Sequence, residues 1–269
     1  FLKKTKNIKN YIYYFHSPVS TIKNYTPKAF DNYDTILCNG KFQVEEIKFR
    51  EHLKKLNQKK IINTGYFYFD YLKENFNHNI NNQEVLIAPS WNYSQNNYLN
   101  EDFINLINIL LDKGEKVIFR PHPEHFKRSE KILDKIKENN SNSNFEFDNN
   151  NENIFSMQRS KCLITDSSGI AIEYMLVLKR PVLYLDEHDK IHNKDIHDYS
   201  NINIIDNEVK KKFGYLFKQK DFSNIDKIIK NAIENFQYRS KDIENFINEN
   251  FFNYGKTKKF LENNLDKIF

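Results

Sequence analysis

The chain has 269 residues, of which 39% are hydrophobic, enough for one large globular domain or two smaller ones. No apolar run is long enough to cross a bilayer, and no secretory signal is visible. The net charge is +5, but basic residues are mixed with acidic ones along most of the chain, which favours a solvated surface over nucleic-acid binding.

The first part of the chain alternates short apolar runs with helical patterns. We predict strands over residues 11–15, 35–38 and 60–63, a helix over 42–56, and a short aromatic helix or loop over 66–76. The polar, asparagine-rich segment 78–83 is typical of a linker. Residues 1–80 therefore form a small first lobe in this interpretation. Because the chain begins with Phe1 rather than Met, we expect this lobe to be incomplete.

A second alternation follows the linker. We predict strands over residues 85–88, 116–119, 145–147, 162–165, 182–185 and 202–205, and helices over 101–111, 129–137, 154–159 and after Gly169. Three helical patterns follow from residue 224 to the end. Strands that alternate with helices indicate parallel sheets with helices on both faces. We therefore expect an α/β chain with two Rossmann-like lobes and a cleft between them, the second lobe spanning residues 84–250.

Chemically versatile residues follow many of these strands. They are His16, Gly65, Ser90, Arg120, His122, Asp166, Ser167 and Ser168. Ligands of open α/β sheets bind outside the carboxyl ends of the strands. The sequence therefore predicts that these residues gather around a ligand.

The segment CLITDSSGIAIEYMLVLKRPVLYLD, residues 162–186, predicts a strand, a polar turn, a helix and a strand. Ser167, Ser168 and Gly169 precede a helix whose first N–H groups and positive dipole end suit phosphate or pyrophosphate. The alternative is an ordinary helix N-cap, with a serine or Asp166 as the cap. Glu173, one turn into the helix, either reaches a pair of ribose hydroxyls or complements the helix dipole.

The sequence Arg120-Pro121-His122-Pro123 follows another predicted strand. The prolines keep this backbone out of a helix, the arginine offers a fork to phosphate oxygens, and the histidine can protonate or stabilise a leaving phosphate. The alternative is a rigid turn with a surface histidine. His125 is close enough in sequence to take over the role.

His16 ends an aromatic strand of the first lobe and suits a general base for an acceptor hydroxyl; a histidine satisfied by backbone at a turn is the alternative. The run DEHDKIHNKDIHD contains His188, His192 and His197, but without tight ligand spacing, so a solvated loop is favoured and no metal is expected.

The cysteines and two basic segments indicate the cellular compartment of the protein. Cys38 and Cys162 lie in apolar runs and are expected to be buried, reduced thiols, as in the cytosol. Residues 3–9 and 256–259 are basic and poor in acids, so they suit weak, peripheral contact with an anionic membrane surface. We expect a cytoplasmic protein, with the inner face of the cell membrane as an option.

Several motifs resemble those of the CDP-glycerol glycerophosphotransferase family, whose enzymes build teichoic-acid and capsule-type polymers. FRPHPEH resembles its R-x-HP element, and ITDSSGIAIEYMLVLKRPVLYLD its T-D-x-S-S element with the helix and strand that follow. VLIAPSWN resembles A-P-T-W with Ser90 for Thr, and NTGYFYFD resembles G-Y-P-x-x-D with Phe67 for Pro. YFHSPVST is similar to W-H-G only at His16.

The resemblance implies a GT-B-like fold, with the acceptor in the first lobe, the nucleotide donor in the second, and a last helix, residues 251–269, that packs back on the first lobe. It implies that Arg120, Ser167 and Ser168 hold the donor diphosphate, that His122 assists the leaving group, and that His16 acts as base or acceptor binder. It assigns Asp166 and Glu173 to organising the donor site. Ser90 and Gly169 complete the predicted donor-binding set.

The predicted function is transfer of a polyol phosphate, similar to glycerol phosphate, from a CDP-linked donor to a hydroxyl of a surface-polymer or lipid-linked acceptor. CMP is released, and neither metal nor cofactor is expected. Two alternatives stay open at this point. One is a GT-B glycosyltransferase that uses a nucleotide-sugar to build surface polysaccharide. The other is a non-catalytic, nucleotide-binding scaffold lobe.

Overall fold

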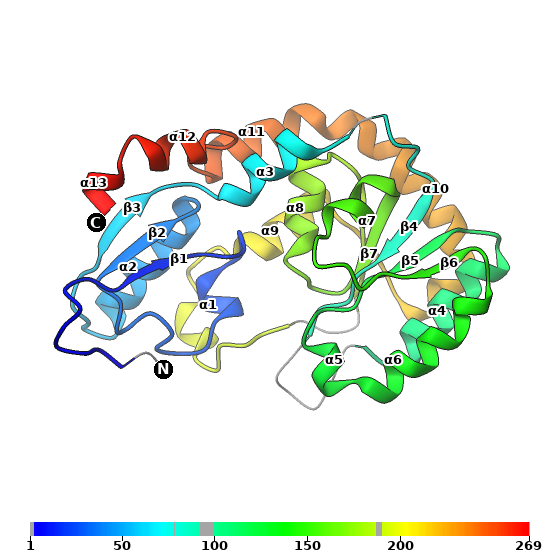
Figure 1. The fold of residues 1–269 in the computed structure, drawn as a ribbon, viewed down its shortest axis with the longest axis horizontal. Helices are drawn as coiled ribbons and strands as arrows, with labels where there is room; N and C mark the ends of the chain where they lie inside the picture. Colours follow the sequence, from blue (N-terminus) through cyan, green and yellow to red (C-terminus); the bar gives the residue numbers. More distant parts are fainter. Residues whose placement is uncertain (1–2, 78, 92–98, 187–189, 269) are drawn as a thin grey trace. The chain divides into compact units, whose positions relative to one another are not determined.

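The chain forms two compact units in a computed structural model that describes residues 3–77, 79–91, 99–186 and 190–268 (Figure 1). Unit 1 comprises Phe1–Asn75, Ile191–Glu208 and Asp242–Phe269, and unit 2 comprises Phe76–Lys190 and Val209–Lys241. Residues 191–208 and 242–250, which sequence analysis placed in the second lobe, thus cluster with unit 1.

Unit 1 contains a parallel three-stranded sheet in the order β1-β2-β3. Its strands are β1 (Ile12–Tyr14), β2 (Thr35–Cys38) and β3 (Lys60–Asn63). The helices along this part of the chain are α1 (Thr21–Asn24), α2 (Lys41–Leu53) and α3 (Phe67–Asn75). Further along the chain, η2 (Ile196–Tyr199) lies between the two segments of unit 2, and most of α11 (Ser240–Asn250), α12 (Thr257–Glu262) and α13 (Leu265–Ile268) follow the second of them.

Aromatic side chains fill the core of unit 1. Phe15, Phe30, Ile36, Cys38 and Ile47 are buried together, with tyrosines packed against them. Edge-to-face pairs connect the rings; those of Tyr13 and Phe30, for example, lie 5.1 Å apart at 65°. Three strands of three or four residues bury little area by themselves, and each aromatic side chain adds a large apolar surface.

The C-terminal segment packs onto unit 1 at two glycines. Phe252 N donates to the Asn39 carbonyl at 2.9 Å, and Gly40 forms an antiparallel bridge with Phe251. Gly65 has a φ of +91°, and a Cβ there would lie 2.3 Å from the Phe252 carbonyl oxygen. The close approach of the two backbones therefore requires glycine at this position.

Unit 2 contains a six-stranded, fully parallel sheet in the order β6-β5-β4-β7-β8-β9. Its strands are β4 (Glu84–Ile87), β5 (Val117–Phe119), β6 (Phe145–Phe147), β7 (Ser160–Thr165), β8 (Val182–Leu185) and β9 (Tyr215–Phe217). The chain runs outward from β4 in one direction and from β7 in the other. β4 and β7 are neighbours, so a topological switch point lies between them, where open α/β sheets bind ligands.

Helices connect these strands and follow the last of them (Figure 1). They are α4 (Glu101–Asp112), α5 (His125–Arg128), α6 (Glu130–Lys137), η1 (Glu138–Ser141), α7 (Ile154–Arg159), α8 (Ile170–Val177), α9 (Ile205–Phe213), η3 (Gln219–Asn224), α10 (Ile225–Phe236) and η4 (Gln237–Arg239). On α4, Phe103, Leu106 and Leu110 recur on one face and lie in the core beside the buried strands. This packing fixes the loops at the carboxyl edge of the sheet.

The structure confirms the α/β class with parallel sheets, but the predicted strand over residues 202–205 is wrong. Residues from Ile205 onward form α9, with Asp206 and Glu208 in the first turn and three lysines in the last, which complements the helix dipole. The last strand is β9, which pairs with β8 in parallel. Within the described ranges, no helix combines the length and apolar composition needed to cross a membrane.

Candidate functional site

Asp166 and Ser90 connect the two strands at the switch point of unit 2. Asp166 follows β7 and is 3% exposed; its carboxylate accepts from Ser90 N at 2.7 Å and from Ser90 Oγ at 2.6 Å. Thr165 Oγ1 donates to the Ala88 carbonyl at 2.7 Å in the same place. A buried charge needs such partners. The two residues therefore frame the site, and Asp166 does not cap the next helix.

His125 extends this network to the loop after β5. It is 1% exposed, and its Nε2 lies 3.1 Å from the Ser90 carbonyl oxygen. A carbonyl can only accept, so Nε2 carries the proton and Nδ1 is left as an acceptor, without a partner among the described residues. Burial lowers the pKa of His125 to about 4, so the ring is neutral at neutral pH.

Ser167 and Ser168 lie at the start of α8 with their hydroxyls unengaged by the part of the chain that the structure describes. Gly169 occupies the N-cap position, and no side chain caps the helix. An ordinary capping role for the serines is therefore wrong. Two hydroxyls lie together at the carboxyl end of β7, beside the start of α8, where the positive end of the helix dipole favours an anion. Ala171 N and Ile172 N donate to the Ser168 and Gly169 carbonyls, so the hydroxyls are the main donors on offer.

Glu173 lies one turn further along α8 and is 6% exposed. A carboxylate this deeply buried requires hydrogen-bonding partners. Its position on α8 is the one the sequence predicted.

Arg120 is engaged by the neighbouring strand. Its Nη1 lies 2.7 Å from Asp148 Oδ2, and its Nη2 donates to the Asn150 carbonyl at 2.9 Å. The Asp148 side chain is 1% exposed and that of Arg120 is 15% exposed. Arg120 thus anchors the chain that follows β6, a structural role that sequence analysis did not assign. The pKa of Asp148 is lowered by hydrogen bonds from Asn150 and Arg120 that outweigh its burial.

His122 lies at the same edge with two other aromatic rings. Its ring centroid is 5.8 Å from that of Trp91 and 6.3 Å from that of His125. Glu124 N donates to its Nδ1 at 3.2 Å, which leaves Nε2 as the nitrogen that carries the proton in the neutral ring. Arg128 lies 5.5 Å over the Trp91 ring. Unit 2 therefore gathers Ser90, His122, Asp166, Ser167 and Ser168 around the carboxyl ends of β4, β5 and β7.

His16 lies in unit 1, where it follows β1 with its side chain exposed. Its ring packs edge-on against Tyr25, with centroids 6.0 Å apart, and its carbonyl accepts from Tyr66 Oη at 2.9 Å. Neighbouring protein atoms partly desolvate the ring and lower its pKa. A neutral imidazole at the surface is the form that accepts a proton.

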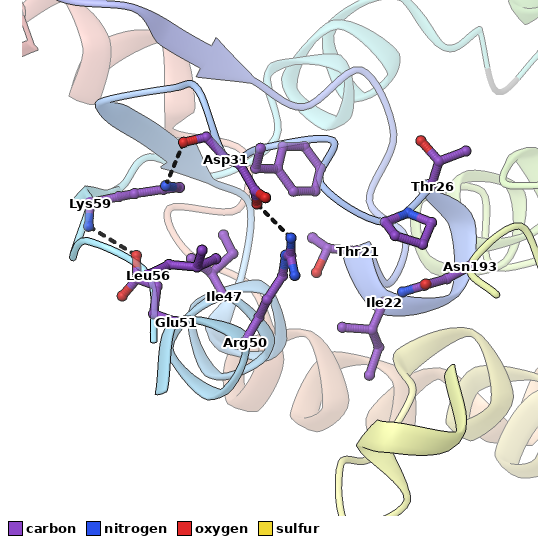
Figure 2. A pocket seen from close by; sticks show the side chains of 12 residues that line it. Thr21, Ile22, Thr26, Asp31, Ile47, Arg50, Glu51, Leu56, Lys59 and Asn193 are labelled. Carbon is purple, nitrogen blue, oxygen red and sulfur yellow. Dashed lines mark hydrogen bonds and ion pairs between the residues drawn. The ribbon is translucent and has the colours of Figure 1, made fainter. Parts of the chain in front are cut away.

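A small pocket of unit 1 is unsuited to a substrate (Figure 2). Asp31 accepts from Arg50 and, through its carbonyl, from Lys59, while Lys59 N donates to Glu51. The cavity volume is about 20 Å³, room for roughly one water. These charged residues stabilise the connection between α2 and β3.

Metal coordination finds no support in the ranges that the structure describes, where no group of three or more His, Cys, Asp or Glu side chains is placed to hold an ion. His188 of the histidine-containing run lies outside the described residues. His192 instead hydrogen-bonds through Nδ1 with the Asn24 carbonyl at 3.1 Å.

The sequence matches one protein family over most of its length. The model of the family described as CDP-Glycerol:Poly(glycerophosphate) glycerophosphotransferase matches residues 19–259. No curated protein matches the sequence.

The fold is similar to solved structures. The H548A variant of the wall teichoic acid polymerase TagF superposes with a TM-score of 0.59 at 19% identity, covering 99% of this chain and 69% of that one. The Methanocaldococcus jannaschii UDP-GlcNAc 2-epimerase with UDP-GlcNAc and UDP gives 0.50 at 15% identity, covering 87% and 61%. S. aureus MnaA with UDP gives 0.51 at 14%, covering 87% and 60%. The likeness confirms the GT-B-like fold class.

Proposed function

Because the chain belongs to the CDP-glycerol:poly(glycerophosphate) glycerophosphotransferase family, we propose that it transfers a glycerol phosphate-like group from a CDP-linked donor to a hydroxyl of a cell-surface polymer. The acceptor oxygen attacks the β-phosphorus of the donor. The bond from that phosphorus to the bridging oxygen breaks, and CMP leaves with the bridging oxygen. The acceptor proton passes to a base, and the product is a phosphodiester.

The unengaged hydroxyls of Ser167 and Ser168 at the start of α8 carry this proposal. They lie beside the β4–β7 switch point, and a helix N-terminus with two additional donors suits a diphosphate that gains charge on one phosphate as it breaks. Gly169 adds an N-cap without a side chain, so a phosphate can approach the backbone closely.

The remaining unit 2 residues take supporting roles in the proposal. Asp166 and Ser90 hold the carboxyl ends of β7 and β4 together and so shape the donor site. His122 stabilises or protonates the departing CMP. Glu173 binds the ribose hydroxyls. Arg120 acts on the diphosphate only through the guanidinium edge that Asp148 and Asn150 leave available.

His16 serves in the proposal as the base that takes the acceptor proton. Its lowered pKa keeps the ring in the proton-accepting form at neutral pH. It belongs to unit 1, the unit that we assign to the acceptor.

The test is CMP release from CDP-glycerol with a polymer acceptor in the presence of a chelator. We expect turnover by the wild-type chain and a loss of at least about tenfold for Ser168→Ala. Ser223→Ala, which removes a hydroxyl just before α10, is the matched control and should keep wild-type activity. Release of a nucleoside diphosphate from a nucleotide-sugar would instead indicate a glycosyltransferase. Nucleotide binding without turnover would indicate a scaffold.

Peripheral membrane contact is a separate part of the proposal. Residues 3–9 and 256–259 carry the basic side chains that suit an anionic surface. Co-sedimentation with vesicles that contain anionic lipid, at low and high salt, tests this contact. Binding that salt does not weaken would contradict an electrostatic origin.

A further inference from the structure

The backbone of residues 16–21, here called the His16 loop, is held by buried side chains from other parts of unit 1. Tyr66 Oη donates to the His16 carbonyl at 2.9 Å, Asn39 Nδ2 to the Ser17 carbonyl at 3.1 Å, and Gln43 Nε2 to the Val19 carbonyl at 3.1 Å. Loops usually satisfy such groups with water. Here three carbonyls in a six-residue segment each have a side-chain donor.

The N–H groups at the far end of the loop bind carboxylates. Ser20 N donates to Asp206 Oδ2 at 2.7 Å, and Thr21 donates to Glu46 Oε2 through both its N and its Oγ1, each at 2.6 Å. These distances are at or below the short end of the range for such hydrogen bonds. The loop is thus fixed at both ends and in the middle.

Helix α2 supplies much of this support with polar side chains on its buried face. Among its buried residues, Gln43 and Glu46 are both fully buried at 0% exposure, a position where helices normally carry apolar side chains. Burying a glutamate is unfavourable unless hydrogen bonds compensate for the lost water. Here Thr21 supplies two donors and the Ser20 side chain a third, and Gln43 accepts from Asn39 N at 2.7 Å. The polar face of α2 is matched to the His16 loop.

We propose that Glu46 is a positioning residue that fixes the His16 loop from α2 and thereby sets where the His16 imidazole points. The inference rests on the proposed role of His16 as the base in the transfer. Glu46 contacts Thr21 and acts on His16 only through the loop backbone, in concert with Asn39 and Gln43. A base must lie within hydrogen-bond reach of the proton it removes, so small displacements of the loop reduce the rate.

The test compares Glu46→Ala with Glu46→Gln. The alanine variant removes the acceptor, and we expect kcat to fall about tenfold to a hundredfold while KM for CDP-glycerol stays within about twofold. One amide oxygen can accept from both Thr21 N and Thr21 Oγ1, so the glutamine variant should restore most of kcat. Unchanged kcat in Glu46→Ala would overturn the proposal.

Glu51 offers a matched control on the same helix. It is 7% exposed, and its Oε1 accepts from Lys59 N at 2.9 Å, outside the His16 loop. Glu51→Ala therefore removes a similar buried acceptor, and we expect it to keep kcat. Equal losses of kcat in Glu51→Ala and Glu46→Ala would show a general effect of stability and refute positioning.

A readout at His16 separates this proposal from the proposed reaction. The imidazole resonances of His16, assigned with His16→Gln, should shift in Glu46→Ala but not in Glu46→Gln or Glu51→Ala. If the His16 resonances shift in Glu46→Ala alone but the wild-type chain shows no turnover, the positioning role is supported and the proposed transfer reaction is refuted. If the wild-type chain turns over but the resonances do not shift in this way, the transfer reaction is supported and the positioning role is refuted. If Glu46→Ala does not fold, Thr21→Val, which removes the Thr21 hydroxyl donor to Glu46, takes its place with an expected loss of kcat of about threefold to tenfold.

Discussion

At the scale of single residues, the ion pair of Arg120 and Asp148 changes what a mutation at Arg120 would mean. Arg120→Ala leaves the Asp148 carboxylate buried with fewer donors. We expect the free energy of unfolding to fall by about 3 kcal/mol, because an unpaired buried charge is strongly unfavourable. Urea unfolding measures this, and Arg120→Ala with Asp148→Asn should lose less than the sum of the two single variants.

A loss of turnover in Arg120→Ala therefore requires a parallel measurement of stability. His122→Ala gives a cleaner test of the donor site, because the His122 side chain is only partly buried, whereas that of Arg120 supports the buried Asp148 carboxylate. A variant that lost turnover but kept wild-type unfolding would support a role in the reaction.

The lowered pKa of the buried His125 predicts that the folded chain loses stability in acid. Its pKa is about 4 in the folded chain against 6.5 in water, so between these values the unfolded chain binds more protons. Stability should fall as pH drops from 6.5 to 4, by up to about 3 kcal/mol. His125→Gln keeps a donor for the Ser90 carbonyl and should flatten this dependence. A pH profile unchanged by the substitution would contradict the assignment.

The sequence predicted most of the residues that lie at the candidate site of unit 2, but it did not predict which residues contact one another there. Strand ends predicted the positions of Ser90, His122 and Asp166, because the apolar runs of β4, β5 and β7 stood out from their flanks. Asp148 was missed since β6 is short and the polar residues after it are typical of a loop. His125 was seen only as a substitute for His122, because burial of a helix-start histidine has no sequence signature.

At the scale of secondary-structure elements, the packing of the C-terminal segment against Gly65 should make that position intolerant of any side chain. Gly65→Ala would place a Cβ at 2.3 Å from the Phe252 carbonyl oxygen, on a backbone with positive φ. We expect unit 1 to lose about 2–4 kcal/mol. Gly114→Ala is the control: its φ is also positive, but no atom lies within 4 Å of the added Cβ. If the melting temperature fell equally in both variants, the positive φ alone would account for the loss of stability, and the close approach of Phe252 would not contribute.

Element prediction was reliable where the apolar pattern was long, as for α4, and failed near residue 205. There the run from Ile202 to Ile205 looked like a strand by composition. The acids and lysines that follow it suit a helix, and the last strand was missed because β9 has only three residues.

At the scale of the whole molecule, the two units should respond to pH in opposite directions. Burial, opposed by hydrogen bonds from Ser20 and Thr21, raises the pKa of Glu46 to about 7 from 4.5, so the folded chain binds more protons between these values. Stability of unit 1 should therefore fall as pH rises through this window, while that of unit 2 rises up to pH 6.5 because of His125. Calorimetry at pH 5 and 7.5 should show two transitions that move oppositely, and Glu46→Gln should reduce the shift in unit 1, to which the raised pKa of the buried Asp206 also contributes. Transitions that move together would contradict this assignment.

The division of the chain between the units has a consequence for its synthesis. The sheet of unit 1 comes from residues 12–63, but residues 242–269 complete that unit. Unit 2 ends at Lys241. On the ribosome, unit 2 can therefore finish folding while nascent unit 1 still lacks the segment whose Phe252 carbonyl lies against Gly65. Of the two units, the one whose sheet is synthesised first is thus the one completed last.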